Sequence, residues 1–214
     1  EAVALGVDKI RLTGGEPLVR KGVVNLVKML ASIDGLKDLA MTTNGVYLTK
    51  YAAELKEAGL HRVNISLDTV NEEDFSKITR VGKLSDVLAG IEAVKSAGLF
   101  PIKINCVIKE SQFEKPAQAV AQFCKDNDLQ VRFIKEMDLE AGTFSRVIGG
   151  DGGHCASCNR LRLTASGQVM PCLMSEFGYS VRELGAKGAI HAALGNKPET
   201  GTSNKKNAFY NIGG

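Results

Sequence analysis

Segments typical of β-strands alternate with segments typical of α-helices from residue 9 to residue 137. The strand candidates are rich in Ile, Val and Leu and lie at 9–13, 38–43, 62–68, 102–108 and 131–137. The helix candidates lie between them at 23–33, 49–59, 84–98 and 115–128. Strict alternation indicates parallel strands joined by crossover helices. The pattern therefore predicts an α/β sheet or barrel, and five strands are too few to close an eight-stranded barrel.

Three of the strand candidates have one polar and one apolar face, because side chains alternate along a strand. The polar faces carry Lys9, Arg11 and Thr13 on the first, Asn64, Ser66 and Asp68 on the third, and Lys103 and Asn105 on the fourth. Such a face meets either water or a ligand. Three polar strands together favour a ligand cavity inside an incomplete barrel over a plain exposed sheet face.

The sequence Gly14-Gly15-Glu16-Pro17 follows the first strand candidate. Two glycines allow positive φ angles and let a ligand approach the backbone closely, and Glu16 can accept from a cation or an amine. A plain turn from a strand to a helix is the alternative. Active sites of parallel α/β folds lie at this end of the strands, which favours the ligand.

Three of the five cysteines cluster behind a Gly-rich connection: Cys155, Cys158 and Cys172. An odd number of cysteines with three close in sequence indicates a metal site in a reducing cytoplasm rather than disulfides. His154 adjoins Cys155 and could complete a Cys3His zinc site, so zinc and iron–sulfur both remain open from the residues alone. Cys106 and Cys124 lie in apolar patterns and are expected to be small buried hydrophobic residues.

Composition excludes some classes of protein. The net charge of +3 is too small to indicate nucleic-acid binding, and no apolar run approaches the roughly 18 residues that span a membrane. With 44% hydrophobic residues the chain suits a globular protein. The first ten residues lack an initiating Met and look like the end of a helix entering a strand, so we expect preceding residues to be missing.

Five motifs in order resemble one known family: IRLTGGEPLVR, MTTNG, VNISLD, KINCVI and CNRLRLTASGQVMPCL. They resemble the radical S-adenosylmethionine (radical SAM) GTP 3′,8-cyclases of molybdenum-cofactor biosynthesis. The terminal NIGG at 211–214 resembles the Gly-Gly tail of that family. The resemblance implies a partial α/β barrel of the radical SAM kind over 1–138. It also implies a C-terminal segment over 139–214 that holds an auxiliary [4Fe–4S] cluster.

The resemblance assigns three sets of site residues and no catalytic side chain. The S-adenosylmethionine set is Gly14, Gly15, Glu16, Ser66 and Met137; the GTP set is Lys9, Arg11, Thr42, Lys103, Arg160, Leu161 and Arg162; the cluster set is Cys155, Cys158 and Cys172. Three thiolates leave one iron of a four-iron cluster open to a nitrogen or oxygen of the purine. Guanidinium and ammonium groups suit a triphosphate.

The chemistry implied is the rearrangement of GTP to the cyclic precursor of pyranopterin. A 5′-deoxyadenosyl radical removes the ribose 3′ hydrogen, and the carbon radical attacks C8 of guanine. The implied partners are GTP, a reducing electron donor and the next enzyme of the pathway, with a homodimer left open and neither nucleic acid nor membrane involved. Two alternatives stand beside it: another radical SAM enzyme acting on a peptide, and a zinc-stabilised nucleotide-binding module.

The sequence departs from the family pattern in two places. It contains no C-x3-C-x2-C motif for the first, radical-generating cluster, so we expect these 214 residues by themselves to be inactive. The stretch between Met137 and Cys155 is also shorter than the usual connection of the family.

Overall fold

The computed structural model describes residues 1–201 and 203–207, which form two compact units. The barrel unit comprises 8–135 and 148–150, and the cysteine unit comprises 1–7, 136–147 and the rest of the chain from Asp151. The expected boundary at residue 138 lies beside the change of unit after Lys135. The first seven residues, however, group with the cysteine unit.

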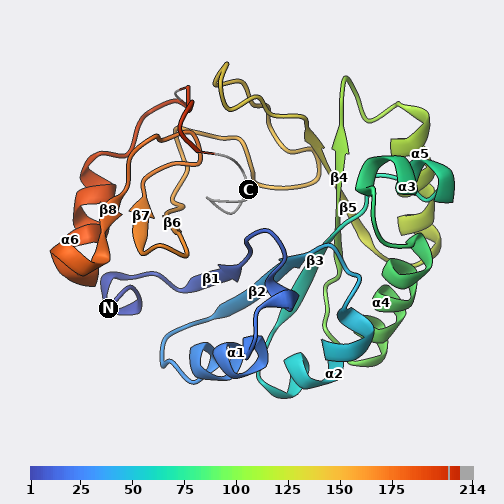
Figure 1. The fold of residues 1–214 in the computed structure, drawn as a ribbon, viewed down its shortest axis with the longest axis horizontal. Helices are drawn as coiled ribbons and strands as arrows, with labels where there is room; N and C mark the ends of the chain where they lie inside the picture. The colour runs from blue at the N-terminus through green and yellow to red at the C-terminus, as the bar shows by residue number, and fades with distance from the viewer. Residues whose placement is uncertain (202, 208–214) are drawn as a thin grey trace. The chain divides into compact units, whose positions relative to one another are not determined.

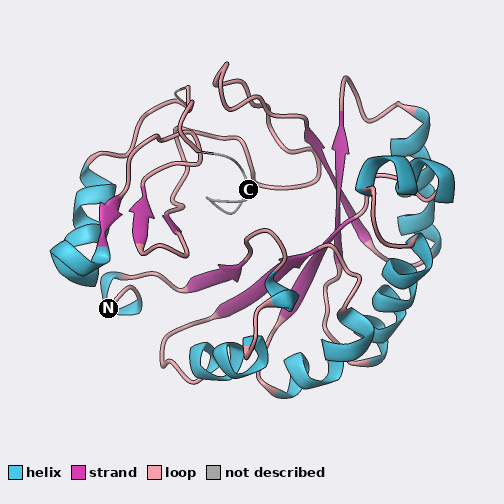
Figure 2. Ribbon diagram, in the orientation of Figure 1, coloured by secondary structure: helices cyan, strands magenta, loops and turns pink. Residues whose placement is uncertain are grey.

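The barrel unit contains one five-stranded sheet. Its strands are β1 (Lys9–Leu12), β2 (Asp38–Thr43), β3 (Arg62–Ser66), β4 (Lys103–Ile108) and β5 (Gln130–Lys135). They lie in sequential order and every neighbouring pair is parallel (Figure 2). This confirms the predicted α/β class and the incomplete parallel barrel. The strands β3 and β5 end before Asp68 and Met137, which the sequence had placed inside them.

The helices α1 (Val23–Ala31), α2 (Leu48–Glu57), α4 (Leu84–Ser96) and α5 (Lys115–Asp126) were predicted within a few residues. They run along one side of the sheet (Figure 1). The short 3-10 helix η2 (Pro17–Val19) and the helix α3 (Glu72–Thr79) were missed. Asn71 begins α3 because its side chain accepts from the Asp74 N–H at 3.0 Å, and three acidic residues follow in the first turn.

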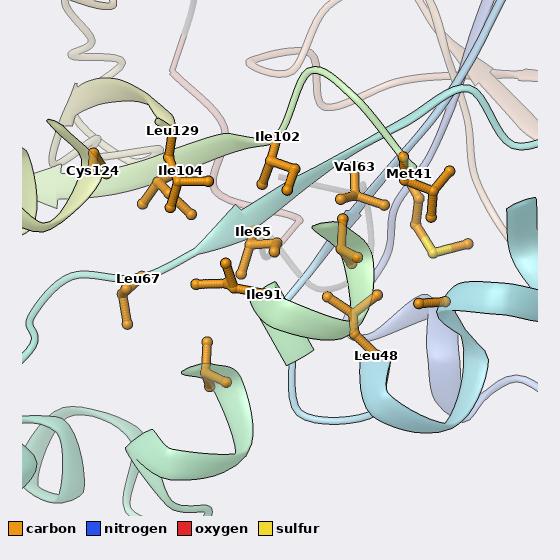
Figure 3. Packing of buried hydrophobic residues seen from close by; sticks show 14 of the residues in the cluster. Met41, Leu48, Val63, Ile65, Leu67, Ile91, Ile102, Ile104, Cys124 and Leu129 are labelled. Atoms are coloured by element: carbon orange, nitrogen blue, oxygen red, sulfur yellow. The ribbon is translucent and has the colours of Figure 1, made fainter. Parts of the chain in front are cut away.

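The apolar faces of the strands form the core of the barrel unit. Ile65 and Ile104 of neighbouring strands are fully buried together with Ile91 of α4 (Figure 3). Burial of such a side chain stabilises the fold by about 1.5–3 kcal/mol. The polar residues of the same strands therefore point to the opposite face, as the alternation predicted.

The cysteine unit contains short elements that the sequence did not reveal. These are the 3-10 helix η1 (Val3–Leu5), the strands β6 (Arg162–Leu163), β7 (Gln168–Met170) and β8 (Tyr179–Ser180), and the helix α6 (Val181–Gly195). The strands form an antiparallel sheet in the order β6-β7-β8. Gly185 kinks α6 with a φ of 67°. The Gly-Gly tail at 213–214 lies outside the described residues.

None of the helices in the described part of the chain is both long enough and apolar enough to cross a membrane.

Candidate functional site

The polar face of the barrel sheet brings four of the predicted GTP residues onto one surface. Thr42, Asn64 and Lys103 occupy one row across β2, β3 and β4. Neighbouring strands are about 4.8 Å apart, so Thr42 and Lys103 are separated by about 10 Å. Lys9 and Arg11 project from β1 on the same side, and both are exposed. The sheet of the barrel unit thus presents hydroxyl, amide and cationic groups on one side.

A hydrogen-bonded chain that the sequence did not predict runs along this face. Arg62 donates to Asp38 through Nε at 3.0 Å and through Nη2 at 2.5 Å, and its Nη1 lies 3.5 Å from Oδ1 of Asn64. The amide of Asn64, which is fully buried, lies 3.5 Å from Oγ1 of Thr42. These hydrogen bonds link Asp38 to Thr42 through Arg62 and Asn64, and they orient the side chains of all four residues.

The ion pair also sets the charge state of Asp38. Burial by itself would raise the pKa of this carboxyl group, but the hydrogen bond and charge of Arg62 lower the pKa overall, with smaller contributions from His61 and Arg11. Asp38 is therefore a carboxylate at neutral pH, and its negative charge neutralises the positive charge of Arg62 on this face.

The Gly-Gly-Glu-Pro turn is fixed to the end of β2 by its glutamate. Oε1 of Glu16 accepts from Oγ1 of Thr43 at 2.7 Å and from the N–H of Leu18 at 2.9 Å, and Oε2 accepts from the N–H of Asn44 at 2.7 Å. The carboxylate therefore joins two strand ends. Its predicted contact with an amine stays a prediction.

The two glycines of this turn leave open space. Gly14 has a φ of 144°, which few side chains allow, and a Cβ atom on either Gly14 or Gly15 would meet no atom within 4 Å. A ligand can therefore approach the backbone of this turn closely, as the sequence predicted.

A cavity of about 190 Å³ lies beyond the ends of β2 and β3. Ser66, assigned to the cofactor, lines it together with Asp68 and with apolar side chains of α3 such as Phe75 and Ile78. Burial raises the pKa of Asp68, although the Val107 N–H donates to its carboxylate at 2.7 Å and opposes that rise. Met137, the last residue of the cofactor set, is half-buried in the cysteine unit.

The three clustered cysteines are half-buried, and each is a free thiol. The N–H of Cys158 donates to the carbonyl of Cys155 at 3.0 Å, which closes a tight turn. Sγ of Cys172 accepts from the N–H of Met174 at 3.4 Å. Cys106 and Cys124 differ from them, because burial raises their thiol pKa values to about 12 and about 11. These two are inert core residues, as expected.

Cations lie close to two of the three clustered thiols. Burial by itself would raise the pKa of Cys158, but hydrogen bonds from Arg160 and the charges of Lys197 and Arg160 lower it overall. Arg162 interacts with the charges of both Cys158 and Cys172, while burial and Arg160 lower its own pKa. Low-pKa thiols near cations are the form in which cysteine binds metal.

Leu161, assigned to the GTP set, packs against the small buried cluster of Val169, Ala189, Ile190 and Ala193. Its side chain supports the fold of the cysteine unit, and the predicted contact of this position with GTP is not tested.

The donor chemistry of the cysteine segment fits a cluster: three free thiols, an N–H directed at one sulfur, and nearby cations. Cys155, Cys158 and Cys172 would hold it. Among the described residues, no three His, Cys, Asp or Glu side chains are gathered closely enough to hold a metal ion. The assembly of the thiols around a metal therefore stays a prediction.

Comparison with known proteins decides the family. The model of the radical SAM superfamily matches residues 1–124. The GTP 3′,8-cyclase of Thermodesulfovibrio yellowstonii is 36% identical over 232 residues, covering 87% of this chain and 72% of that protein. The chain belongs to the GTP 3′,8-cyclase family of radical SAM enzymes. The motif-based resemblance is thereby confirmed.

Other members of the GTP 3′,8-cyclase family match to a similar extent. The enzyme of Peptoclostridium acidaminophilum is 39% identical, covering 81% of this chain and 67% of that protein. That of Moorella thermoacetica is 37% identical over 93% of this chain and 73% of that protein. The three alignments are 232, 218 and 244 positions long, although this chain has 214 residues and is covered only in part. These family members therefore contain residues that have no counterpart in this chain.

Among solved structures, the coproporphyrinogen III oxidase HemN of Escherichia coli, a radical SAM enzyme, is 14% identical with a TM-score of 0.46. The match covers 60% of this chain and 31% of that protein's chain.

Proposed function

We propose that this protein acts as a GTP 3′,8-cyclase, which converts GTP by radical SAM chemistry to the cyclic pyranopterin precursor in molybdenum-cofactor biosynthesis. The observation that carries the proposal is the polar sheet face of the barrel unit in a chain of this family. Thr42 and Lys103 share one row there, and Arg11 lies on the same side. Hydroxyl and cationic groups on a parallel sheet suit a nucleoside triphosphate.

The residues of the barrel unit would bind GTP by complementary contacts. The ammonium groups of Lys9 and Lys103 provide point charges, whereas the guanidinium of Arg11 can make forked contacts with phosphate oxygens. In the cysteine unit, Arg160 and Arg162 would add guanidinium groups, because the resemblance assigns both to GTP. Arg162 is half-buried beside two of the thiols, which supports a fixed orientation of its side chain.

S-adenosylmethionine would bind at the carboxyl ends of the barrel strands. The open space beside Gly14 and Gly15 would admit its polar end, and Ser66 in the cavity would contact the rest. Glu16 holds the turn in place through Thr43 and Asn44, so the glycine backbone is presented in one conformation. This role for Glu16 is indirect.

A [4Fe–4S] cluster bound by three thiolates supplies one iron that can accept a nitrogen or oxygen of the purine. The chain's own contribution is to hold the thiols of Cys155, Cys158 and Cys172 in thiolate form, which the nearby cations favour for Cys158. The electron donor, the next enzyme of the pathway, the dimer and a cytoplasmic location remain predictions.

The test is an anaerobic reaction of the full protein with S-adenosylmethionine, GTP and a strong reductant, followed by chromatography. We expect 5′-deoxyadenosine together with the cyclic GTP product. The 214 residues by themselves are the comparison, since they contain no C-x3-C-x2-C motif and are expected to form no deoxyadenosine. Deoxyadenosine formation by the full protein with GTP left unconverted would contradict the proposed substrate and favour the peptide-modifying alternative.

A further inference from the structure

Lys197 connects the two arms of chain that carry the clustered cysteines. Its Nζ donates to the carbonyl of Arg160 at 2.8 Å and to the carbonyl of Pro171 at 2.7 Å. Arg160 is two residues beyond Cys158, and Pro171 directly precedes Cys172. One ammonium group therefore reaches both arms, although the two carbonyl groups lie 11 positions apart in the sequence.

The environment of Lys197 differs from that of an ordinary surface lysine. The residue is half-buried, and both of its hydrogen bonds go to backbone oxygens rather than to a flexible carboxylate. Placing an ammonium group partly out of water is unfavourable unless hydrogen bonds compensate for the lost solvent. Lys187, on the helix α6 that precedes it, is exposed and provides the contrast. The two carbonyl contacts therefore fix the side chain of Lys197.

A second side chain, that of Asn204, also binds the arm that carries Cys172. Asn204, which is 2% exposed, donates through Nδ2 to the carbonyl of Ser175 at 3.0 Å and through its backbone N–H to the carbonyl of Leu139 at 2.7 Å. Asn204 does not reach the arm of Cys158 through any of these bonds. Lys197 is thus a side chain that contacts both arms directly, in addition to the backbone pairing of β6 with β7 between them.

We propose that Lys197 is a positioning residue of the three-cysteine site: its ammonium group braces the Cys158 arm against the Cys172 arm so that the thiols hold one metal group together. The brace explains how a unit with few large buried side chains fixes two loops that bear ligands. It also places a positive charge beside Cys158. The identity of the metal group, though not the brace itself, rests on the function proposed above.

The first test is hydrogen exchange on the anaerobically purified full protein, whichever metal it carries. Lys197→Met keeps a similar length but removes the donors and the charge, Lys197→Arg keeps both, and Lys187→Met is the matched control on α6. We expect faster exchange in residues 158–163 and 168–175 of Lys197→Met only, with the barrel unit unchanged. Unchanged exchange in both arms would overturn the proposal. If Lys197→Met fails to fold, Lys197→Gln, with a shorter neutral donor, replaces it, and the same increase is expected.

The second test measures the loss of bound metal to a chelator. Support of a ligand by a neighbouring residue typically changes metal retention by about 10-fold or more. We expect Lys197→Met to release metal faster by about that factor, while Lys197→Arg and Lys187→Met remain close to the unchanged protein. Equal rates of metal release from all four proteins would contradict the proposed role of Lys197. If the unchanged protein holds no iron and sulfide, the proposed cluster fails, while the exchange measurement still decides whether Lys197 braces the two arms.

Discussion

In the barrel unit most buried side chains are large and form one cluster with residues from β2, β3, β4 and β5, whereas the buried hydrophobic cluster of the cysteine unit is small. Ile65 and Ile104 are fully buried in the barrel unit. The buried hydrophobic cluster of the cysteine unit consists of Val169, Ala189, Ile190 and Ala193. Apolar burial scales with the area removed from water, so it stabilises the two units very unequally.

The cysteine unit compensates with polar contacts that span long stretches of sequence. Lys197 and Asn204 bind backbone carbonyls around Cys172, and the thiols offer ligands for a metal. Metal binding contributes directly to folding where a small core cannot. We therefore expect the barrel unit to owe its fold mainly to the hydrophobic effect, and the cysteine unit to depend on its hydrogen bonds and on the metal proposed to bind its thiols.

Removal of metal ligands is expected to have the largest effect, because it acts on only one of the two units. Replacing Cys155 and Cys158 by Ser removes two ligands of a site whose binding energy can reach about 10 kcal/mol. Hydrogen exchange should show loss of protection in the cysteine unit and native protection in the barrel unit. The control is Cys124→Ala, at a buried thiol of α5. Equal loss of protection in both units would contradict the expectation that only the cysteine unit depends on these ligands.

Truncating one buried isoleucine in each unit tests whether apolar burial stabilises the barrel unit more than the cysteine unit. Ile104→Ala in the barrel unit should lower the free energy of unfolding by about 2–5 kcal/mol, because it leaves a cavity among packed side chains. Ile190→Ala in the cysteine unit should lower it by less, since Ile190 belongs to a much smaller buried cluster and is 8% exposed. Urea unfolding of both variants measures the difference. A larger loss of unfolding free energy at Ile190 would contradict the expectation that apolar burial stabilises the cysteine unit less than the barrel unit.

Both units are expected to contribute to GTP affinity. Arg11→Ala and Arg160→Ala each remove a charge-assisted contact, so each should weaken binding by about 1.5–3 kcal/mol. Titration calorimetry measures this, and the loss should shrink at high salt because exposed charges are screened. Arg20→Ala is the control, since its guanidinium donates to the neighbouring Lys21 carbonyl. Unchanged affinity in either arginine variant would contradict the assignment of that arginine to GTP.

The smallest expected effect concerns the ion pair on the polar face. Asp38→Asn should lower the free energy of unfolding by about 1 kcal/mol, between the values for exposed and buried charged hydrogen bonds. Arg62 holds the folded pKa of Asp38 below its unfolded value, so the stabilisation is present above about pH 4. It is lost as the pH falls through the lowered folded value. Unfolding curves of both proteins from pH 7 to pH 3 should therefore converge, and a constant difference would contradict this.

The barrel unit was largely predictable because its signals are local and repeated. Alternation along residues 62–68 separated the apolar Val63 and Ile65, which are buried in the core, from the polar Asn64 and Ser66. Ser66 is exposed as expected, whereas Asn64 is also fully buried, against Arg62 and Thr42. The helix α3 was missed because it is short and buries only Phe75, although Asn71 and the acidic residues after it are a typical helix start.

The cysteine unit was predictable only through its motif. Its strands are two or three residues long, too short for any periodicity to show. The contacts of Lys197 join residues 26 and 37 positions apart, and Glu16 binds Thr43 across 27 positions. Contacts of this kind depend on the tertiary fold, so a single sequence contains no signal for them.

We expect this chain, as a member of its family, to use Cys155, Cys158 and Cys172 to hold an iron–sulfur cluster. The most direct test is the metal and sulfide content of the anaerobically reconstituted 214-residue chain, compared with a variant in which all three cysteines are Ala. We expect about four iron and four sulfide per chain, with visible absorption, and none in the variant. Stoichiometric zinc with negligible iron would contradict the claim and favour the zinc-stabilised nucleotide-binding alternative.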